Sequence, residues 1–273
     1  MDHDRAIAEL VAWAGGEETI RLVVLVGSLG RGDPDVDELS DLDVQLYVTD
    51  PEQLLADPGW HRRFGEVLVE ENLPNPGWYP TRLAYYVDGK IDFTVTPLAD
   101  LGVDTYDEPF RVLLDKDGVS ARLPLVPPDR PLPGEAEFAE SCNWFYAAAI
   151  MGARCVVRNE PWLAKIRDWD AKQELLRMIE WDHRARYGRE ALTWFLGKHL
   201  EQWADPDVRE GLDRCFAGFP VSDARAALLA TMDLYDRLAV RTAEALGLAR
   251  PPIAAARAEV ARILAARAGS RPG

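Results

Sequence analysis

The first half of the chain is built from short apolar runs separated by turn residues, a pattern that predicts β-strands. A segment of helical composition, residues 2–13, comes first, and residues 21–26 then form a continuous apolar run of buried-strand length. In residues 41–48 polar and apolar positions alternate, so we predict a half-buried strand that carries Asp41 and Asp43 on its polar face. A helix followed by strands therefore opens the chain.

A β-hairpin is predicted further along. Residues 82–87 and 90–96 are rich in strand-forming residues, and the Asp-Gly pair between them is a strong hairpin signal. In the second strand of this hairpin, Asp92 and Thr94 share a face because side chains alternate along a strand. Residues 112–115 are a further strand candidate.

The second half of the chain has a different pattern. Residues 122–134 contain five prolines, which disfavour both helices and central strands, so we predict a linker there. Predicted helices lie near residues 135–157, 161–186, 189–203, 206–217, 222–246 and 252–268. The sequence thus predicts an α+β protein, with a domain of mixed β-sheet and helices over residues 1–121 and an all-α helical bundle domain over residues 135–273.

Composition narrows the classes of function. The 273 residues carry a formal net charge of −15, which disfavours nucleic acid as a partner and attracts small cations, although the same charge is also a common solubility device. No stretch approaches the roughly 18 apolar residues of a membrane span. The three cysteines lack CxxC spacing and suit buried thiols in a reducing compartment. We therefore expect a cytoplasmic protein without membrane association, and a monomer is favoured.

The residues that point to chemistry begin at Gly27. Gly27 and Ser28 follow the buried run and lead into a helix, where free backbone N–H groups and a hydroxyl can bind phosphate oxygens. An ordinary strand-to-helix turn has the same sequence pattern. Asp41 and Asp43 project from one strand face, close enough to bind Mg²⁺ together. Asp92, on a neighbouring strand, supplies the third carboxylate of two-metal phosphoryl transfer. We refer to Asp41, Asp43 and Asp92 as the acidic triad.

Other phosphate and metal motifs are missing from the sequence. There is no GxxxxGK[ST], and the glycines at 27, 30 and 32 are spaced GxxGxG rather than GxGxxG. The four histidines show neither HExxH nor paired spacing, which argues against a zinc site. Kinase, dinucleotide-binding and zinc-enzyme interpretations are therefore disfavoured.

The Gly-Ser, Ser-Asp-x-Asp and single-Asp motifs, in this order, resemble those of the DNA polymerase β-type nucleotidyltransferase superfamily. Within it, the chain resembles the streptomycin (aminoglycoside 6-) adenylyltransferase family over most of its length, from the N-terminal helix to the last long helix. The stretches that carry this resemblance are residues 26–32, 60–66, 86–94, 113–118, 142–145 and 175–181.

The resemblance implies an N-terminal nucleotidyltransferase domain, a C-terminal helical domain that binds the acceptor, and ATP as the donor of AMP. Carried over residue by residue, it implies that Gly27, Ser28, Arg31 and Ser40 contact the nucleotide. It also implies that the acidic triad holds magnesium, expected as two ions. Asp92 is then either a ligand of the ion at the attacking hydroxyl or the base that accepts its proton.

Acceptor contacts are expected in the helical half, where carboxylates and indoles are interleaved and can hold guanidinium or ammonium groups. The candidates are Glu137, Trp144 and Glu180, although a tryptophan at helical spacing more often packs in a core. One departure from the family pattern concerns the acceptor. Arg154 stands where the family usually has lysine, and the two cations differ in geometry.

The predicted function is magnesium-dependent transfer of AMP from ATP to a hydroxyl of a small cationic aminoglycoside, with streptomycin as the first candidate. Pyrophosphate is released, and the product is an inactivated antibiotic. Two alternatives stay open: a nucleotidyltransferase that modifies another small molecule or a partner protein, and a nucleotide-binding module without catalysis. The helical half, which can enclose a small molecule, disfavours a protein acceptor. The acidic triad disfavours pure binding, because unneutralised carboxylates repel one another.

Overall fold

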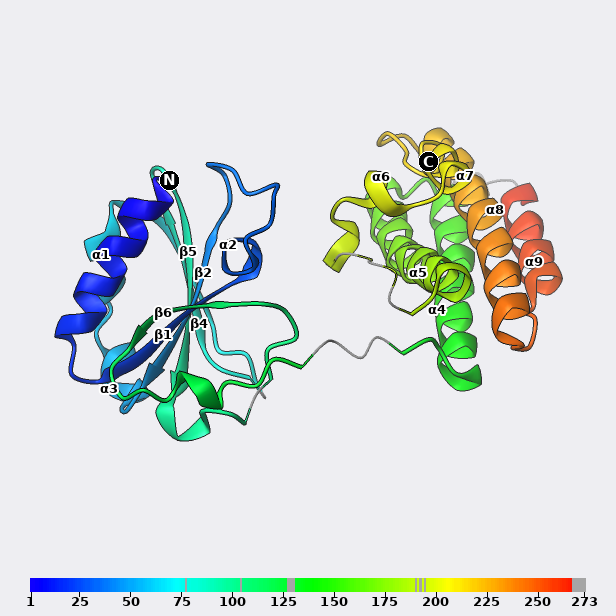
Figure 1. The fold of residues 1–273 in the computed structure, drawn as a ribbon. Coiled ribbons are helices and arrows are strands. Elements are labelled where there is room, and N and C mark those ends of the chain that lie inside the picture. The colour runs from blue at the N-terminus through cyan, green and yellow to red at the C-terminus, as the bar shows by residue number, and fades with distance from the viewer. Residues whose placement is uncertain are drawn as a thin grey trace, which may run out of the picture. The chain divides into compact units, whose positions relative to one another are not determined.

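The computed structural model describes residues 1–76, 78–103, 105–126, 131–189, 191, 193 and 195–266. The chain divides into two compact units, Met1–Asp129 and Arg130–Gly273 (Figure 1). The described strands all belong to the N-terminal unit, and the described regular structure of the C-terminal unit is helical. The chain is therefore an α+β protein, which confirms the predicted fold class.

The described strands form a six-stranded mixed sheet in the order β3-β4-β5-β2-β1-β6. Their bounds are β1 (Ile20–Val26), β2 (Leu42–Val48), β3 (Val67–Leu73), β4 (Thr81–Tyr86), β5 (Gly89–Pro97) and β6 (Arg111–Asp115). β2 and β5 pair in parallel, and the other neighbouring strands pair antiparallel. The parallel pair brings two segments that are distant in sequence into register at the centre of the sheet.

One face of this sheet packs against α1 (His3–Gly16) (Figure 1). Leu10 and Trp13 of α1 share a core with Leu42 and Val44 of β2, the apolar set that the sequence pattern predicted. Asp2 caps α1 by accepting a hydrogen bond from the backbone N–H of Arg5. The remaining helical segments of this unit are α2 (Gly27–Arg31), α3 (Pro51–Ala56), and the 3-10 turns η1 (Trp60–Phe64), η2 (Leu98–Asp100) and η3 (Ser120–Arg122).

The opposite face of the sheet is also largely covered. Tyr47 of β2 packs there with Leu101 and Leu123 from the segments that flank β6, and Gln45 is buried. The prediction that this strand is half-buried is therefore wrong over most of its length. Within β2 only Asp43, near the start of the strand, keeps a partly exposed side chain.

The C-terminal unit is a bundle built around three long helices, α4 (Glu135–Val157), α5 (Pro161–Tyr187) and α8 (Val221–Leu246), with α9 (Ile253–Ala265) packed on α4 (Figure 1). Shorter helical segments are η4 (Phe195–Gly197), α6 (Leu200–Trp203) and α7 (Pro206–Leu212). In the core the rings of Phe145 and Tyr235 stack with centroids 3.5 Å apart. Cys142, Cys155 and Cys215 are buried free thiols, as predicted.

The helix predicted over residues 189–203 is wrong. Among the described residues of this segment, only η4 and α6 are helical. Leu196 and His199 have positive φ angles of 53° and 54°, which a continuous right-handed helix does not contain. The helix predicted over residues 206–217 is real but ends at Leu212.

One strand was not predicted from the sequence. β3 is the outer strand next to β4, and most of its residues are exposed. An exposed edge strand lacks the apolar alternation that identifies a half-buried strand, so its pattern did not distinguish it from a loop. The edge position explains the missed prediction.

The proline-rich segment begins within the N-terminal unit. Leu123 is buried there, and Leu125 forms an isolated parallel bridge with Tyr106. Residues 127–130 of the predicted linker lie outside the described residues. No described residue beyond position 140 pairs with the sheet. The boundaries 1–121 and 135–273 remain a prediction.

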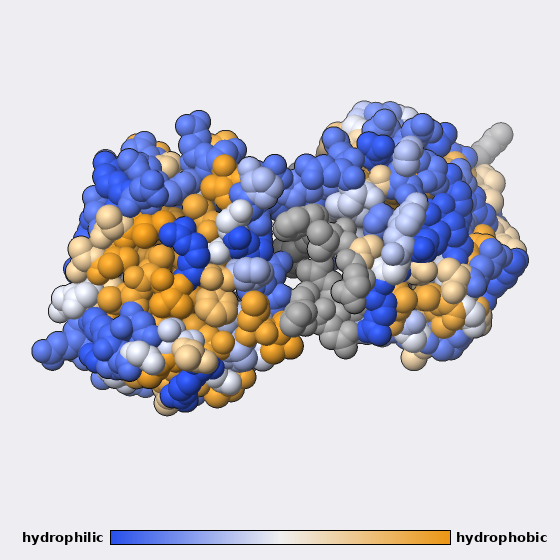
Figure 2. Space-filling view, in the orientation of Figure 1, coloured by the Kyte–Doolittle hydropathy of each residue, from blue (hydrophilic) through white to orange (hydrophobic). Residues whose placement is uncertain are grey.

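Figure 2 shows hydrophobic residues gathered on the viewed face of the N-terminal unit, while the viewed face of the helical unit is mostly hydrophilic. Exposed large apolar residues of the N-terminal unit include Val103, Val112 and Leu125.

Across the part of the chain that the structure describes, no helix has the length and apolar character needed to span a membrane.

Candidate active site

The acidic triad lies at the start of the parallel strand pair. In the β2–β5 register, Asp43 is directly opposite Asp92, and both side chains point to the face of the sheet that α1 does not cover. Asp41 immediately precedes β2. The structure therefore brings together the three carboxylates that the sequence singled out on separate strands.

Lys90 lies within this cluster and was not identified from the sequence. Its ammonium Nζ donates hydrogen bonds to Asp41 Oδ2 at 2.9 Å and to Asp92 Oδ2 at 2.8 Å. The two carboxylates outweigh the effect of burial and raise the pKa of Lys90, so it is a cation here. The signal was present in the sequence, because Lys90 and Asp92 are two residues apart on one strand and share a face.

The remaining electrostatics are those of crowded carboxylates. Burial, followed by repulsion from Asp92 and Asp41, raises the pKa of Asp43 to about 6. Burial also raises the pKa of Asp92. Asp92 Oδ1 is buried and accepts no hydrogen bond from any described residue. Such a site stabilises a cation, since opposite charge relieves the repulsion.

These donors fit a hard divalent cation, which prefers carboxylate oxygens. Within the described residues, no group of three or more His, Cys, Asp or Glu side chains is already arranged around a metal position. Lys90 explains this, because its ammonium lies between Asp41 and Asp92. The unpartnered Asp92 Oδ1 nevertheless offers an oxygen ligand.

Gly27 lies directly beside Asp43 of the acidic triad. It begins α2 directly after β1, and its neighbour Val26 pairs with Asp43 in the β1–β2 register. The φ angle of Gly27 is +66°, and a Cβ added there would lie 2.0 Å from Asp43 Oδ2. Glycine is therefore required both by the backbone conformation and by the close approach of Asp43. Ser28 follows in the first turn of α2.

Two other predicted nucleotide contacts take part in the loops around the site. The Arg31 guanidinium forms ion pairs with Asp33, at 2.6 Å, and with Glu108. Ser40 Oγ accepts a hydrogen bond from the backbone N–H of Asp37 at 3.0 Å. Both side chains stabilise loops beside the acidic triad, and their contact with a nucleotide remains a prediction.

A cavity of about 520 Å³ opens beside Gly27 on the same face of the sheet. Gln45 and Thr94, the next residues on that face after Asp43 and Asp92, line it. Its other lining residues are Val26, Gly27, Trp78, Thr105, Tyr106, Asp107, Glu108 and Pro109. Sequence reasoning missed this cavity, because its walls come from loops whose approach to the sheet is a tertiary feature.

The predicted acceptor contacts of the helical unit do not form one cluster. Glu137 and Glu180 line a cavity of about 540 Å³ together with Trp181. Trp144, which is 63% exposed, lines a different cavity of about 400 Å³. Arg154 is exposed on α4, and its guanidinium contacts the sulfur of Met151, which lines the same cavity as Trp144.

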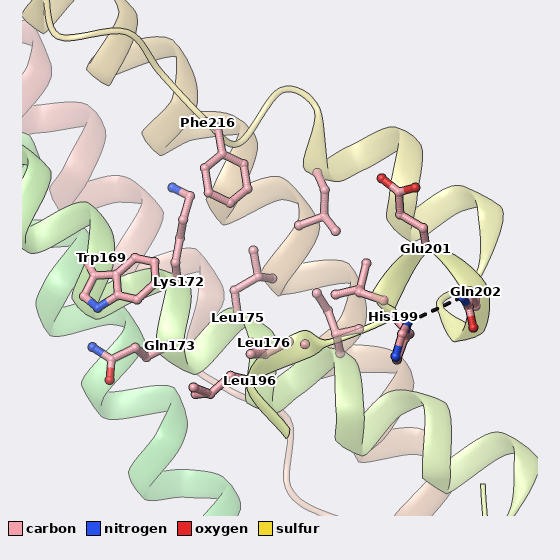
Figure 3. A pocket seen from close by; sticks show the side chains of 14 residues that line it. Trp169, Lys172, Gln173, Leu175, Leu176, Leu196, His199, Glu201, Gln202 and Phe216 are labelled. Atoms are coloured by element: carbon pink, nitrogen blue, oxygen red, sulfur yellow. Dashed lines mark hydrogen bonds between the residues drawn. The ribbon is translucent and has the colours of Figure 1, made fainter. Parts of the chain in front are cut away.

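A further cavity of the helical unit, of about 700 Å³, lies between α5 and the segment that carries η4 and α6 (Figure 3). Trp169, Leu175 and Phe216 point into it from several sides. Lys172, one of its polar residues, forms an ion pair with Asp168 at 2.5 Å. This mostly apolar lining suits an apolar ligand better than a polycation.

Comparison with known proteins places this chain in a family. Residues 2–258 match the family model of streptomycin adenylyltransferase. The chain is 28% identical over 195 residues to an aminoglycoside 6-adenylyltransferase of Campylobacter jejuni, covering 66% of this chain and 67% of that protein. It is 29% identical over 197 residues to the enzyme of the same name from Staphylococcus aureus, covering 66% and 70%.

A solved structure, that of an aminoglycoside 6-adenyltransferase from Bacillus subtilis, is also similar. The alignment covers 96% of this chain and 97% of that chain, with 20% sequence identity and a TM-score of 0.48.

Proposed function

We propose a function from one established premise: the chain belongs to the streptomycin adenylyltransferase family and is a nucleotidyltransferase. The proposed reaction is transfer of AMP from ATP to a hydroxyl of an aminoglycoside, with streptomycin as the first candidate acceptor. Pyrophosphate is the second product. Modification of the antibiotic in this way would confer resistance.

The observation that carries this proposal is the register of β2 and β5. It sets Asp43 opposite Asp92, with Gly27 in contact with Asp43. Carboxylates beside a glycine turn at the start of a helix provide both parts that nucleotidyl transfer needs. The carboxylates bind cations, and the turn offers backbone N–H groups to phosphate oxygens.

Asp41, Asp43 and Asp92 are the residues proposed to hold magnesium, after Lys90 gives up its hydrogen bonds to two of them. Bound Mg²⁺ supplies charge neutralisation and polarises the phosphoryl group that is attacked. The number of ions proposed is two, as the three carboxylates suggest.

The chain's own residues then orient the reactants. The backbone of Gly27 and Ser28 holds the triphosphate of ATP so that its α-phosphorus faces the acceptor hydroxyl. The hydroxyl oxygen forms a bond to that phosphorus, and the bond from phosphorus to the bridging oxygen of pyrophosphate breaks. Asp92 Oδ1, which accepts no hydrogen bond from the described residues, either accepts the hydroxyl proton directly or would hold the ion that acidifies the hydroxyl, in which case the proton passes to solvent.

An acceptor with several positive charges fits the charge of the molecule. A formal net charge of −15 attracts cations over distances comparable to the Debye length. Glu137, Trp144 and Glu180 remain proposed acceptor contacts, distributed over two cavities of the helical unit.

The proposal is tested by incubating the protein with Mg·ATP and a panel of aminoglycosides and analysing the products by mass spectrometry. We expect streptomycin to gain the mass of one adenylyl group, which is AMP less one water, while pyrophosphate accumulates in equal amount. If no aminoglycoside is modified but another small molecule or a protein is, the acceptor class is wrong and the transfer chemistry stands. If nothing is modified and ATP is bound unchanged, the enzymatic proposal fails.

A further inference from the structure

The cavity of about 520 Å³ beside Gly27 has no part in the proposed magnesium site, yet it opens on the same sheet face. Its floor continues the rows of the acidic triad, since Gln45 follows Asp43 on β2 and Thr94 follows Asp92 on β5. A group bound in this cavity would therefore lie next to the reacting centre.

An exposed tryptophan forms one wall of the cavity. Trp78 is 56% exposed, although it belongs to a short connection held by several hydrogen bonds. Its backbone N–H donates to the carbonyl of Asn75 at 2.8 Å. The Asn75 side chain donates to the carbonyl of Tyr79 and to Thr81 Oγ1, both at 3.0 Å, which stabilises its own positive φ of 43°. The indole is thus presented to solvent by an organised turn.

Other lining residues of the cavity are polar or acidic. Tyr106 OH donates to Gln45 Oε1 at 2.5 Å and is 2.9 Å from Tyr47 OH, so the phenol is fixed above the floor. Asp107 and Glu108 follow it and also line the cavity. Acidic side chains in the lining attract a cation.

We propose that this cavity binds a guanidinium or ammonium group of the acceptor, with the indole of Trp78 as a cation–π face and Asp107 as its counter-charge. This inference rests on the proposed transfer of AMP to a cationic acceptor. It assigns a specificity-determining subsite to the N-terminal unit. Glu108 contributes less, because Arg31 already pairs with it. An indole facing a delocalised cation and an adjacent carboxylate is the arrangement that recognises guanidinium groups.

The subsite is tested with Trp78→Phe and Trp78→Leu, which separate an aromatic face from apolar bulk. The binding of streptomycin and of ATP is measured for each variant by calorimetry, alongside the KM of each substrate. Trp162→Leu serves as the control, because Trp162 is 75% exposed on α5 and does not line this cavity. We expect Trp78→Leu to weaken streptomycin binding about tenfold, Trp78→Phe about threefold or less, and neither to change ATP binding.

A second pair of variants tests the charge. Asp107→Asn should weaken streptomycin binding about threefold to tenfold at low salt. Asp4→Asn removes the same charge from an exposed position on α1 and should leave binding unchanged. Similar binding by the leucine and phenylalanine variants would overturn the cation–π role.

Weaker ATP binding with streptomycin binding intact would overturn the proposal in favour of a nucleoside pocket. Calorimetry does not depend on turnover. If no aminoglycoside is adenylylated, the proposed function fails. The calorimetry of the Trp78 variants still shows whether streptomycin binds at Trp78.

Discussion

At the residue scale, the most informative side chain is Lys90, because its ammonium is the cation that pairs with two carboxylates of the acidic triad. Its side chain is only 18% exposed, and its ammonium bridges Asp41 and Asp92. Replacing it with methionine leaves partly buried carboxylates facing each other, so the metal-free protein should lose about 1–3 kcal/mol of stability. Mg²⁺ should raise the Tm of Lys90→Met by more than it raises the Tm of the wild type. The measurement is the Tm of each protein with and without Mg²⁺.

The matched control for this prediction is Lys116→Met. Lys116 belongs to the same unit and donates to the carbonyl of Glu17, away from the acidic triad. Its loss can lower Tm, but Mg²⁺ should not recover it. Equal Mg²⁺ stabilisation of the two variants would mean that Lys90 does not occupy the place of a metal ion.

At the element scale, the junction of β1 with α2 is the critical connection. Gly27→Ala places a methyl group against Asp43 and holds an alanine at a φ of +66°. Gly32→Ala imposes a similar backbone penalty, at a φ of +72°, but its Cβ meets nothing within 4 Å. We expect each variant to lose about 1 kcal/mol or more of stability, and only Gly27→Ala to lose at least about tenfold in kcat. Equal kcat values for the two variants would show that catalysis does not depend on the close approach of Gly27 to Asp43.

The turn after β6 gives a pH-dependent prediction at the same scale. Burial alone would raise the pKa of Asp115, but hydrogen bonds accepted from the backbone N–H groups of Ser120 and Val119 lower it to about 2. A lowered carboxyl pKa stabilises the fold above the unfolded value of 3.8, and this contribution is lost as pH falls towards about 2. The difference in Tm between wild type and Asp115→Asn should therefore be constant near pH 7 and shrink below pH 4. A difference that grows on acidification would contradict this role.

The elements differ in how far the sequence could predict them. β2 and the β4–β5 hairpin were predictable, because local alternation and an Asp-Gly turn specify them. β3 was not, since its apolar residues Val67, Leu68 and Val69 are consecutive and do not alternate with polar ones. The break in the helix predicted over residues 189–203 depends on the positive φ angles of Leu196 and His199, which their residue types do not predict. The acidic triad was recognisable from its motifs, and the shared strand face of Lys90 and Asp92 could be predicted as well. The contact of Lys90 with Asp41 and the position of Trp78 depend on tertiary structure.

At the scale of the whole molecule, the charge of −15 should govern how the acceptor is captured. Raising the ionic strength from ~0.05 to ~0.5 M shortens the Debye length about threefold, which weakens steering of a polycation. We expect the KM of streptomycin to rise while kcat changes much less, because screening affects association rather than the bound transition state. A salt-independent KM would show that the net charge serves solubility alone.

The central claim is that the acidic triad carries nucleotidyl transfer, and Asp43 tests it most directly. Asparagine at this position keeps the shape of the side chain and removes the charge of a carboxyl group. Burial, followed by repulsion from Asp92 and Asp41, raises the pKa of that group to about 6, so folding should be intact. The measurement is the rate of streptomycin–AMP formation by wild type and Asp43→Asn with Mg·ATP, followed by mass spectrometry. We predict that the variant unfolds at the wild-type temperature or above and turns over about two orders of magnitude more slowly. A folded Asp43→Asn protein with near-wild-type turnover would contradict the account.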